Sequence, residues 1–487
     1  MAFDLASLLT DNRGRQFELH SRSMNPQLVR VLTTLGFDRT YVRSEGAELI
    51  DAEGGRVLDF LSGFGVFALG RNHPVVKQAL HQAIDADLPN LVQLDCGLLS
   101  GLLARALTGK AHAGIERVFF TNSGAESIET AIKFSRCATG RDRIVFCDHA
   151  FHGLTTGALA LNGGEEFKKG FGPLLPGTTR VPFADADALE RELSRGDVAA
   201  VVVEPIQGKG VYIAPDGYLA AARSSCTRHG TMLVIDEVQT GLGRTGRFFC
   251  HEHWGVAPDI ITVSKALSGG YIPVGAVLTT TAVFDAVYSS MDRAVVHSST
   301  FAQNELAMVA GLATLHVLED EGLVERAARM GERFLDALAP LVERYDLFHE
   351  ARGKGLMIGL EFGPPPARAG RARFAMLEKA RKGLFSQMIV VPLFRRHGIL
   401  TQVAADNVNI VKLLPPLIIG DAEIERFVHA LDDVLADAHR GSGSGLMVEV
   451  GGAMARNAWR QRPRGRQAPP AHQAAEPSHQ PAEPTSR

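Results

Sequence analysis

The residue with the clearest potential for chemistry is Lys265, which follows the apolar run Ile260 to Val263. The run is short and rich in β-branched residues, a pattern typical of a buried strand. A lysine at the end of a buried strand loses hydration unless its amine is paired or used. One use is condensation with an aldehyde, as in a Schiff base to pyridoxal phosphate (PLP). The alternative is an exposed loop lysine, and Lys265 alone does not decide between the two.

Two acidic residues follow other apolar runs of the same kind. Glu204 comes after Val198 to Val203, and Asp236 comes after Met232 to Ile235. One acid at such a place is often a helix cap or a surface charge, but two acids and a lysine at strand ends favour a common site. A carboxylate about 4 Å from a pyridine nitrogen contributes roughly 4 kcal/mol at an effective dielectric of about 20, or about three pKa units. Asp236 is therefore predicted to keep such a nitrogen protonated.

The segment Ser123-Gly124-Ala125-Glu126 has the residues of an anion-binding helix start. Ser123 and Glu126 form a capping-box pattern for a helix that extends to about Ala138 and is closed by Gly140. Free amides at a helix start, beside a glycine that allows close approach, favour a phosphate. A capped helix without a ligand fits the same pattern.

An aromatic residue follows a further run, Arg143 to Cys147. Phe151 lies in the segment Phe151-His152-Gly153, where its ring can stack on a planar ligand. Packing in the core is the alternative for this phenylalanine.

The segment Gly241-Leu242-Gly243-Arg244-Thr245-Gly246 matches the dinucleotide fingerprint G-x-G-x-x-G literally. In that fingerprint the glycines follow a strand directly and open a helix. Here Asp236 to Thr240 separates the glycines from the strand, and no uninterrupted amphipathic helix opens at Gly246. A nicotinamide or flavin site is therefore not predicted.

The elements that must position these residues are indicated by an alternation of apolar runs and helical periodicity between about residues 100 and 300. The runs are continuous rather than alternating, which predicts strands buried on both faces of a mostly parallel α/β sheet. Ligands of such sheets lie outside the carboxyl ends of the strands. The predicted strands are Val118 to Phe120, Arg143 to Cys147, Val198 to Val203, Met232 to Ile235, Ile260 to Val263 and Gly275 to Leu278.

The two ends of the chain have different patterns. Ala47 to Asp51 and Arg56 to Phe60 flank a glycine turn and predict a β-hairpin, and helices alternate with a few strands after about residue 320. The segment after Arg440 is rich in Pro, Gln, Ala and Arg and has too little apolar surface to fold. We therefore expect an N-terminal segment at 1–65 that packs with the small domain, a large domain at 66–318, a small α+β domain at 319–440 and a disordered tail at 441–487.

Composition excludes several classes of protein. The chain has 487 residues and a formal net charge of −3, which gives no electrostatic case for binding nucleic acid. Its five cysteines have no close metal-ligand spacing, so neither a metal site nor a disulfide framework is predicted, and a cytoplasmic location is expected. We expect no membrane span, because no stretch of about 18 apolar residues occurs.

Together these segments resemble the class III (omega) aminotransferases, a family of PLP-dependent enzymes with fold type I. The resemblance covers roughly residues 30 to 435, with the motifs in the family's order. It implies a large domain with a mostly parallel seven-stranded sheet, a smaller α+β domain, and a homodimer with shared active sites. The matching segments are Ser123-Gly124-Ala125-Glu126, Phe151-His152-Gly153, Glu204 to Gly208, Ile235 to Gly241, Ser264-Lys265 and Leu414 to Leu417.

The resemblance also implies roles for individual residues. Lys265 is expected to form the Schiff base and to carry the proton, and Asp236 to pair with the pyridinium nitrogen. Phe151 and Val238 are expected on the two faces of the ring. Ser123, Gly124 and Ala125 are expected to hold the phosphate, together with Thr300 of the neighbouring subunit. Gln239 is expected near the ring hydroxyl, and Glu204 behind the residues that contact the cofactor. His152 is a further cofactor-binding residue that the resemblance implies.

Two positions depart from the pattern of family members that act on amino acids. Many of those members carry an arginine just before Leu-Pro-Pro and a glutamate after the Gln-Gly of the Glu-Pro motif. This chain has Lys412 and Lys209 there, and lysine does not supply the bidentate fork of arginine. We therefore expect an amino acceptor that is an aldehyde without an α-carboxylate, in a pocket whose apolar side includes Phe64.

The predicted reaction is ping-pong amino transfer from an amine or amino-acid donor to an aldehyde or keto acceptor through the Schiff base of Lys265. Rival activities on the same scaffold are those of an aminomutase, a racemase, a lyase, or an acetylornithine or ornithine transaminase. A protein that binds the cofactor or a partner without turnover is a further alternative.

Overall fold

The computed structural model describes residues 3–90, 96–366, 368–380, 384–404 and 409–439. Its central element is a seven-stranded sheet in the order β4-β12-β11-β10-β7-β5-β6. β12 is antiparallel to both of its neighbours, and the other pairs are parallel. The strands are β4 Arg117–Thr121, β5 Arg143–Cys147, β6 Thr178–Val181, β7 Val198–Val203, β10 Met232–Asp236, β11 Ile260–Val263 and β12 Gly275–Thr279.

The prediction of a mostly parallel seven-stranded α/β sheet is confirmed. All six apolar runs are strands of this sheet. The seventh strand, β6, was not among those runs because its sequence Thr-Thr-Arg-Val has a single apolar residue and lies at the edge of the sheet.

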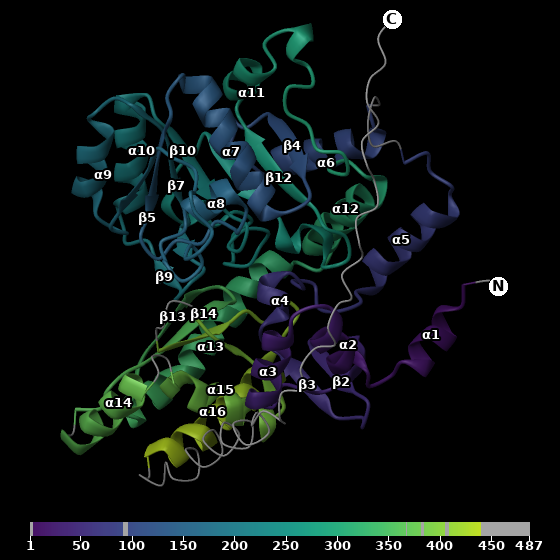
Figure 1. Ribbon diagram of the computed structural model, residues 1–487, viewed down its shortest axis with the longest axis vertical. Helices are drawn as coiled ribbons and strands as arrows, with labels where there is room; N and C mark the ends of the chain where they lie inside the picture. Colours follow the sequence, from purple (N-terminus) through teal and green to yellow (C-terminus); the bar gives the residue numbers. More distant parts are fainter. Residues whose placement is uncertain (1–2, 91–95, 367, 381–383, 405–408, 440–487) are drawn as a thin grey trace, which may run out of the picture.

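Helices cover both faces of the sheet (Figure 1). One face packs on α7 (Gly124–Thr139), α8 (Thr156–Ala160) and α11 (Thr281–Val287), with Phe134 of α7 at the centre of that apolar cluster. The other face packs on a second group of helices, which are α5 (Pro74–Asp85), α6 (Leu98–Thr108), α9 (Ala186–Leu193), α10 (Tyr218–His229) and α12 (Glu305–Asp320).

Two smaller sheets lie below the large one in Figure 1. The first is β1-β2-β3-β15 and the second is the antiparallel sheet β13-β14-β17-β16. Helices α13 (Leu323–Arg344), α15 (Leu384–Arg395) and α16 (Asp421–His439) accompany them. The strands are β1 Tyr41–Glu45, β2 Glu48–Asp51, β3 Arg56–Asp59, β13 Phe348–Lys354, β14 Met357–Phe362, β15 Ile399–Leu400, β16 Gln402–Val403 and β17 Ile410–Leu413.

The N-terminal and C-terminal parts of the chain are joined by backbone pairing. β3 pairs in parallel with β15, and the Leu414 amide donates to the Phe60 carbonyl over 2.7 Å. Directly after Phe60 the chain forms the short helix α4 (Ser62–Gly65). This pairing brings α4 close to the carboxyl ends of the strands of the large sheet.

The sequence pattern also predicts one helix from Phe374 to Phe385, and that prediction is wrong in its extent. The structure has two helices there, α14 (Arg368–Ala380) and α15 (Leu384–Arg395). The tail predicted to be disordered, 441–487, lies outside the described residues.

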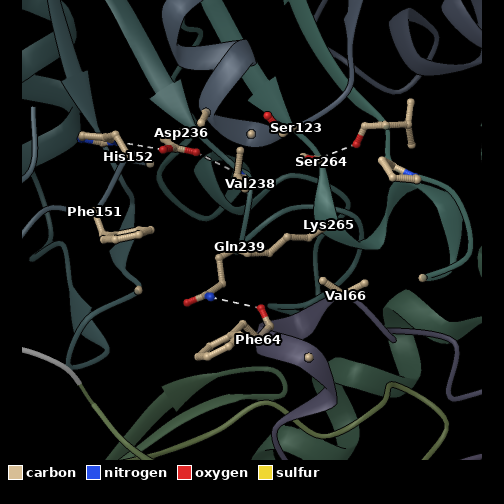
Figure 2. Close-up of a pocket in the computed structure, with 18 of the residues that line it drawn as sticks. Phe64, Val66, Ser123, Phe151, His152, Asp236, Val238, Gln239, Ser264 and Lys265 are labelled. Carbon is tan, nitrogen blue, oxygen red and sulfur yellow. Dashed lines mark hydrogen bonds and ion pairs between the residues drawn. The ribbon is translucent and has the colours of Figure 1, made fainter. Parts of the chain in front are cut away.

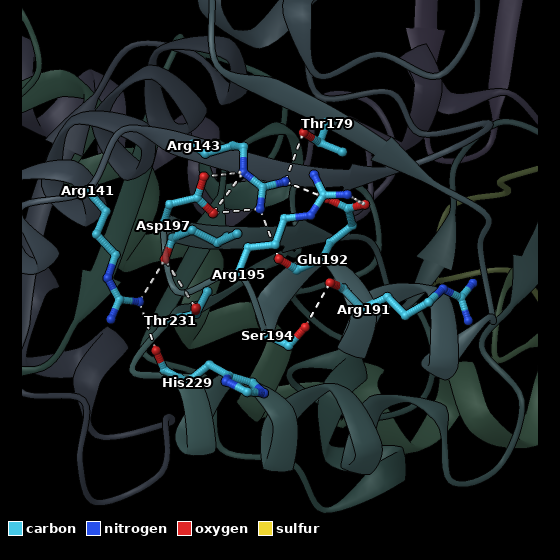
Figure 3. A network of polar contacts seen from close by, with 11 residues as sticks. Arg141, Arg143, Thr179, Arg191, Glu192, Ser194, Arg195, Asp197, His229 and Thr231 are labelled. Carbon is cyan, nitrogen blue, oxygen red and sulfur yellow. Dashed lines mark hydrogen bonds and ion pairs between the residues drawn. The ribbon is translucent and has the colours of Figure 1, made fainter.

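A polar network ties together the amino ends of the strands, opposite to the edge where ligands are expected (Figure 3). The Arg143 guanidinium at the start of β5 donates to Asp197 before β7 over 2.6 Å. It also donates to Glu192 of α9 over 2.6 Å and to Thr179 of β6 over 3.2 Å. One guanidinium therefore fixes three neighbouring strands relative to one helix.

Within the described residues, no helix is both long enough and apolar enough to cross a membrane.

Candidate functional site

The carboxyl ends of β7, β10 and β11 open onto one cavity of about 730 Å³. Glu204, Asp236 and Lys265 come from these three strand ends, and Figure 2 shows Asp236 and Lys265 facing the same space. The cavity is also lined by other residues that the sequence singled out: Phe64, Ser123, Gly124, Ala125, Phe151, His152, Val238, Gln239 and Lys412. Residues spread over more than half of the chain therefore converge at the predicted edge of the sheet.

Lys265 begins a 3₁₀ turn directly after β11 and has a φ of 36°. A positive φ is unfavourable for a residue with a side chain and persists where the surroundings impose it. The preceding Ser264 hydroxyl donates to the Val274 carbonyl over 2.8 Å and fixes the start of this turn. Burial lowers the pKa of Lys265, and the negative charges of Asp236 and Glu204 oppose that change. A buried amine with a lowered pKa is suited to act as a nucleophile and a proton carrier.

Asp236 is held by three groups. Its carboxylate accepts from the Val238 amide over 3.0 Å and from the Thr262 hydroxyl over 3.2 Å, and it lies 2.7 Å from His152 Nδ1. Burial works to lower the pKa of His152, but the hydrogen bond and charge of Asp236, with the charge of Glu204, outweigh it and raise the pKa overall. The arrangement fixes the direction of the Asp236 carboxylate.

Glu204 is occupied by backbone amides. One oxygen accepts from the Phe151 amide over 3.0 Å and the other from the Gly208 amide over 2.9 Å. Burial raises the pKa of Glu204. Its carboxylate therefore joins two loops that border the cavity, which agrees with a place behind the residues that would touch a ligand.

The start of α7 forms an open cup of amides beside the cavity. The Ser123 hydroxyl accepts from the Glu126 amide over 3.2 Å, so Ser123 is the N-cap. The Glu126 carboxylate accepts from the Asn122 amide over 2.8 Å rather than from Ser123, which differs by one residue from the predicted capping box. A Cβ added to Gly124 would lie 2.7 Å from Val238 Cγ1. A larger residue at position 124 therefore requires the start of α7 or the Val238 side chain to move.

A chain of hydrogen bonds crosses the side of the cavity away from Asp236. Lys412 Nζ donates to the Gly208 carbonyl over 2.7 Å and to Gln239 Oε1 over 3.2 Å. Gln239 Nε2 donates to the Phe64 carbonyl over 3.1 Å, and Phe64 has a φ of 64° inside α4. These contacts join β17, the loop after β10 and α4.

Sequence reasoning missed Phe167 and Tyr271, which also line the cavity. The Phe167 ring lies 5.6 Å from the Phe151 ring at an interplanar angle of 68°. Neither residue follows a predicted strand end, so no signal in the sequence marked them.

Thr300 is exposed and does not line the cavity of its own chain. Its neighbour Ser299 accepts a hydrogen bond from the Asn122 side chain over 2.9 Å. This hydrogen bond anchors the segment that contains Thr300 next to the start of α7.

The residues of the cavity fit PLP. The amide cup at Gly124 suits a phosphate, Asp236 suits a pyridinium nitrogen, and Lys265 suits an aldehyde. His152 Nε2 is buried with no hydrogen-bond partner among the described residues. Among the described residues no group of His, Cys, Asp and Glu could hold a metal ion.

Comparisons with known proteins show the family of this chain. The sequence model of the family "Aminotransferase class-III" matches residues 34–435. An acetylornithine aminotransferase from Mycolicibacterium smegmatis is 40% identical over 82% of this chain and 93% of its own length. Aminotransferase PigE from Serratia sp. is 36% identical over 87% of this chain, which spans 53%, about half, of that relative's length.

Solved structures are also similar. The ornithine aminotransferase from Toxoplasma gondii has a TM-score of 0.74 and 30% identity, over 83% of this chain and 91% of its own. An amine transaminase from an uncultivated Pseudomonas species, in its PLP-bound form, has a TM-score of 0.73 and 31% identity, over 82% of this chain and 96% of its own. The family match, the fold and the cavity lead to one conclusion: the chain belongs to the class III aminotransferases, which use PLP.

Proposed function

We propose that this protein is an aminotransferase that moves an amino group from an amine or amino-acid donor to an aldehyde or keto acceptor in two half-reactions. The observation that carries the proposal is the convergence of Lys265, Asp236 and the amide cup at Gly124 on one cavity. Bound PLP supplies an electron sink for the carbon that loses its proton. Aminomutases, racemases and lyases can use the same residues. A transaminase is distinguished from them because it alone leaves the amino group on the cofactor after the first half-reaction.

The roles of the residues follow from their contacts. Lys265 holds the cofactor and moves a proton between the substrate carbon and the cofactor, because its amine reaches the cavity with a lowered pKa. Asp236 keeps the ring nitrogen protonated while His152 and Thr262 hold its carboxylate. The remaining cofactor-binding residues of this proposal are Ser123, Gly124, Ala125, Phe151, Glu204, Val238, Gln239 and, from a second subunit, Thr300.

A homodimer with shared active sites and a cytoplasmic location are part of the proposal. Thr300 is exposed and is not among the residues that line the cavity of its own chain, which supports a role for Thr300 in a second subunit. The absence of close cysteine pairs in the sequence supports a reducing location. We keep the division into 1–65, 66–318 and 319–440 as a proposal; the pairing of β3 with β15 supports grouping the first segment with the third.

The second candidate is an acetylornithine or ornithine transaminase, which the similarity to the Mycolicibacterium smegmatis protein favours. Lys412 and Lys209 oppose it, because neither supplies the bidentate contact of an arginine to a carboxylate. The two candidates differ in whether ornithine-type substrates react far faster than simple aldehydes.

The test is a spectroscopic half-reaction. Purified protein loaded with PLP is mixed with single amine donors, and the visible absorbance of the bound cofactor is followed together with the oxo product. The proposal predicts stoichiometric loss of the visible band with one equivalent of oxo product, recovered on adding an aldehyde, and no such change in Lys265→Ala. A donor that is consumed without leaving its amino group on the cofactor would favour a racemase, a mutase or a lyase instead.

A further inference from the structure

The turn at α4, which borders the cavity, has four consecutive residues with a positive φ. The angles are 48° at Ser62, 60° at Gly63, 64° at Phe64 and 89° at Gly65. Ser62 and Phe64 carry side chains, for which this left-handed conformation is unfavourable, and in proteins it occurs as single residues rather than in runs. Such backbone persists only where its surroundings impose it, and it is concentrated at functional sites. The contacts that impose it here are therefore candidates for a functional role.

A buried ion pair holds the start of this turn. Asp59 is 1% exposed, and its Oδ1 accepts from the Leu61 amide over 3.1 Å and from the Ser62 amide over 2.8 Å. Its Oδ2 accepts from Arg71 Nε over 3.0 Å and from Arg71 Nη2 over 2.7 Å. Both oxygens of the carboxylate are therefore used, and Arg71 fixes the direction in which Asp59 meets the two amides.

The Arg71 guanidinium also covers the Phe67 ring, with 3.9 Å between its central carbon and the ring centre. A planar guanidinium stacks on an aromatic face in a way that a lysine amine does not. The ring packs against two glycines that line the cavity: a Cβ added to Gly63 would lie 3.0 Å from it, and one added to Gly270 would clash with it. Gly270 belongs to the loop that follows the turn of Lys265. Arg71 therefore supports, through Phe67, two segments that border the cavity.

The turn contributes a ring and a carbonyl to the site. The Phe64 side chain lines the cavity and is 46% exposed, so its position depends mainly on the backbone that carries it. The Phe64 carbonyl accepts from Gln239 Nε2, while Gln239 Oε1 accepts from Lys412 (Figure 2 shows the first of these contacts). A side-chain amide has two N–H donors and one carbonyl, so the two contacts fix the direction of the remaining N–H. A shift of the turn would therefore move an apolar surface and a polar donor together.

We propose that the Asp59–Arg71 ion pair is a positioning device for the cavity: it holds the turn at 62–65 and so sets the place of Phe64 and of the Gln239 amide. Neither Asp59 nor Arg71 is among the described residues that line the cavity, so both act through residues that do. The inference deepens the proposed function and rests on it for the nature of the ligands, which are a cofactor with a ring hydroxyl near Gln239 and an apolar substrate beside Phe64.

The chain offers a matched control in the hairpin turn between β2 and β3. There Arg39 Nη1 lies 3.3 Å from Asp51 Oδ2, and the Arg39 guanidinium lies 4.9 Å from the centre of the Phe394 ring. Asp51 Oδ1 accepts from two amides of that turn, over 3.2 Å and 2.6 Å. The same kinds of contact therefore hold a turn at 51–55, none of whose residues lines the cavity. Arg71→Met and Arg39→Met remove one arginine each, and only the first change should reach the cavity.

The first measurement is hydrogen exchange of backbone amides, followed by mass spectrometry, on the PLP-loaded protein and both variants. In Arg71→Met the amides of residues 61–67 are expected to exchange about tenfold faster, because Asp59 loses its fixed direction. In Arg39→Met the faster exchange should be confined to residues 51–55. Wild-type exchange at 61–67 in Arg71→Met would overturn the proposal.

Two further measurements separate positioning from a merely structural role. Calorimetry on the PLP-loaded protein with 2-phenylethanol should show affinity about tenfold weaker in Arg71→Met, because the apolar wall has moved, and unchanged in Arg39→Met. The pH midpoint of the visible band of bound PLP should rise by about half a unit in Arg71→Met alone, because a donor to the ionised ring oxygen is lost. Faster exchange without these two changes would leave the ion pair with a structural role only and overturn the proposal.

Arg71→Lys keeps the test decisive if Arg71→Met does not fold. It retains a positive charge beside the buried Asp59 but lacks the paired N–H contacts and the stacking on Phe67, so the same changes are expected at about a third of the size. If no amine transfers its amino group but the exchange and 2-phenylethanol results hold, the proposed function is at fault and the positioning role stands. Equal affinity for 2-phenylethanol in wild type and the Arg71 variants, or no binding by the wild type, contradicts the positioning role.

Discussion

At the scale of single residues, the cavity is lined by three lysines whose surroundings differ. Lys265 faces two carboxylates, Lys209 pairs with Glu166, and Lys412 bonds to neutral oxygens. Hydration lost on burial is compensated fully only where an opposite charge is near. The three amines can therefore serve three purposes within one cavity.

The lowered pKa of Lys412 predicts a pH dependence of stability. Between about pH 7 and the unfolded value of 10.5 the unfolded chain binds a proton that the folded chain does not, so the contribution of Lys412 to stability rises with pH over that window. Below about pH 7 Lys412 is charged in both states, so the folded protein bears the full free-energy cost of the buried charge. The Tm of Lys412→Met minus the Tm of the wild type should therefore be larger at pH 6 than at pH 9. A difference that is the same at both pH values contradicts the buried, uncompensated amine.

Single residues also mark the limit of what the sequence predicts. Lys265, Asp236 and Glu204 could be predicted to lie together because each follows an apolar run, and a parallel sheet brings the carboxyl ends of its strands to one side. The bonds from Lys412 to Gly208 and Gln239 join residues 204 and 173 positions apart, and no local pattern encodes them. The same holds for Phe167, whose place in the cavity depends on a loop without apolar periodicity.

At the scale of elements, the start of α7 depends on close approach. Ala at position 124 would place its Cβ 2.7 Å from Val238 Cγ1, so the cup or the Val238 side chain must move. Gly124→Ala is expected to weaken PLP binding by about tenfold, or about 1.4 kcal/mol, measured by equilibrium dialysis. Gly101→Ala is the matched control, because Gly101 lies in α6 with nothing within 4 Å of the added Cβ. Equal affinity in both variants would contradict a phosphate cup at Gly124.

The amino ends of the strands are held separately from the site. Arg143→Met removes donors to Asp197, Glu192 and Thr179 and leaves the partly buried Glu192 with its ion pair to the exposed Arg195. We expect a loss of about 2 kcal/mol in the free energy of unfolding, seen as a lower Tm, with kcat per folded molecule unchanged. Arg191→Met, on the exposed face of α9, should leave Tm almost unchanged. A fall in kcat with an unchanged Tm would contradict a purely structural network.

Elements also show why the sheet could be predicted only in part. Buried strands such as β7 give continuous apolar runs, but the edge strands β1 and β6 carry polar residues and gave no such signal. The antiparallel direction of β12 depends on how the chain returns across the sheet, and its apolar run is the same in either direction.

At the scale of the whole molecule, the proposed dimer gives each site a residue from the other subunit. If Thr300 serves the partner's cofactor, a mixed dimer of Lys265→Ala and Thr300→Ala subunits contains one site with both residues intact. Random exchange of equal amounts of the two variants makes about half of the dimers mixed, and each mixed dimer has one intact site, so about a quarter of the wild-type activity should return. Should Thr300 act within its own chain, every site of the mixed dimer stays damaged and no activity returns.

The central claim is that Lys265, among the three lysines of the cavity, is the residue that holds PLP. Borohydride fixes PLP to the amine that binds it, so the protein loaded with PLP can be reduced, digested and analysed by mass spectrometry. The account predicts a PLP-derived mass on the peptide with Lys265 and none on the peptides with Lys209 or Lys412. A label on either of those lysines, or no label at all, would contradict it.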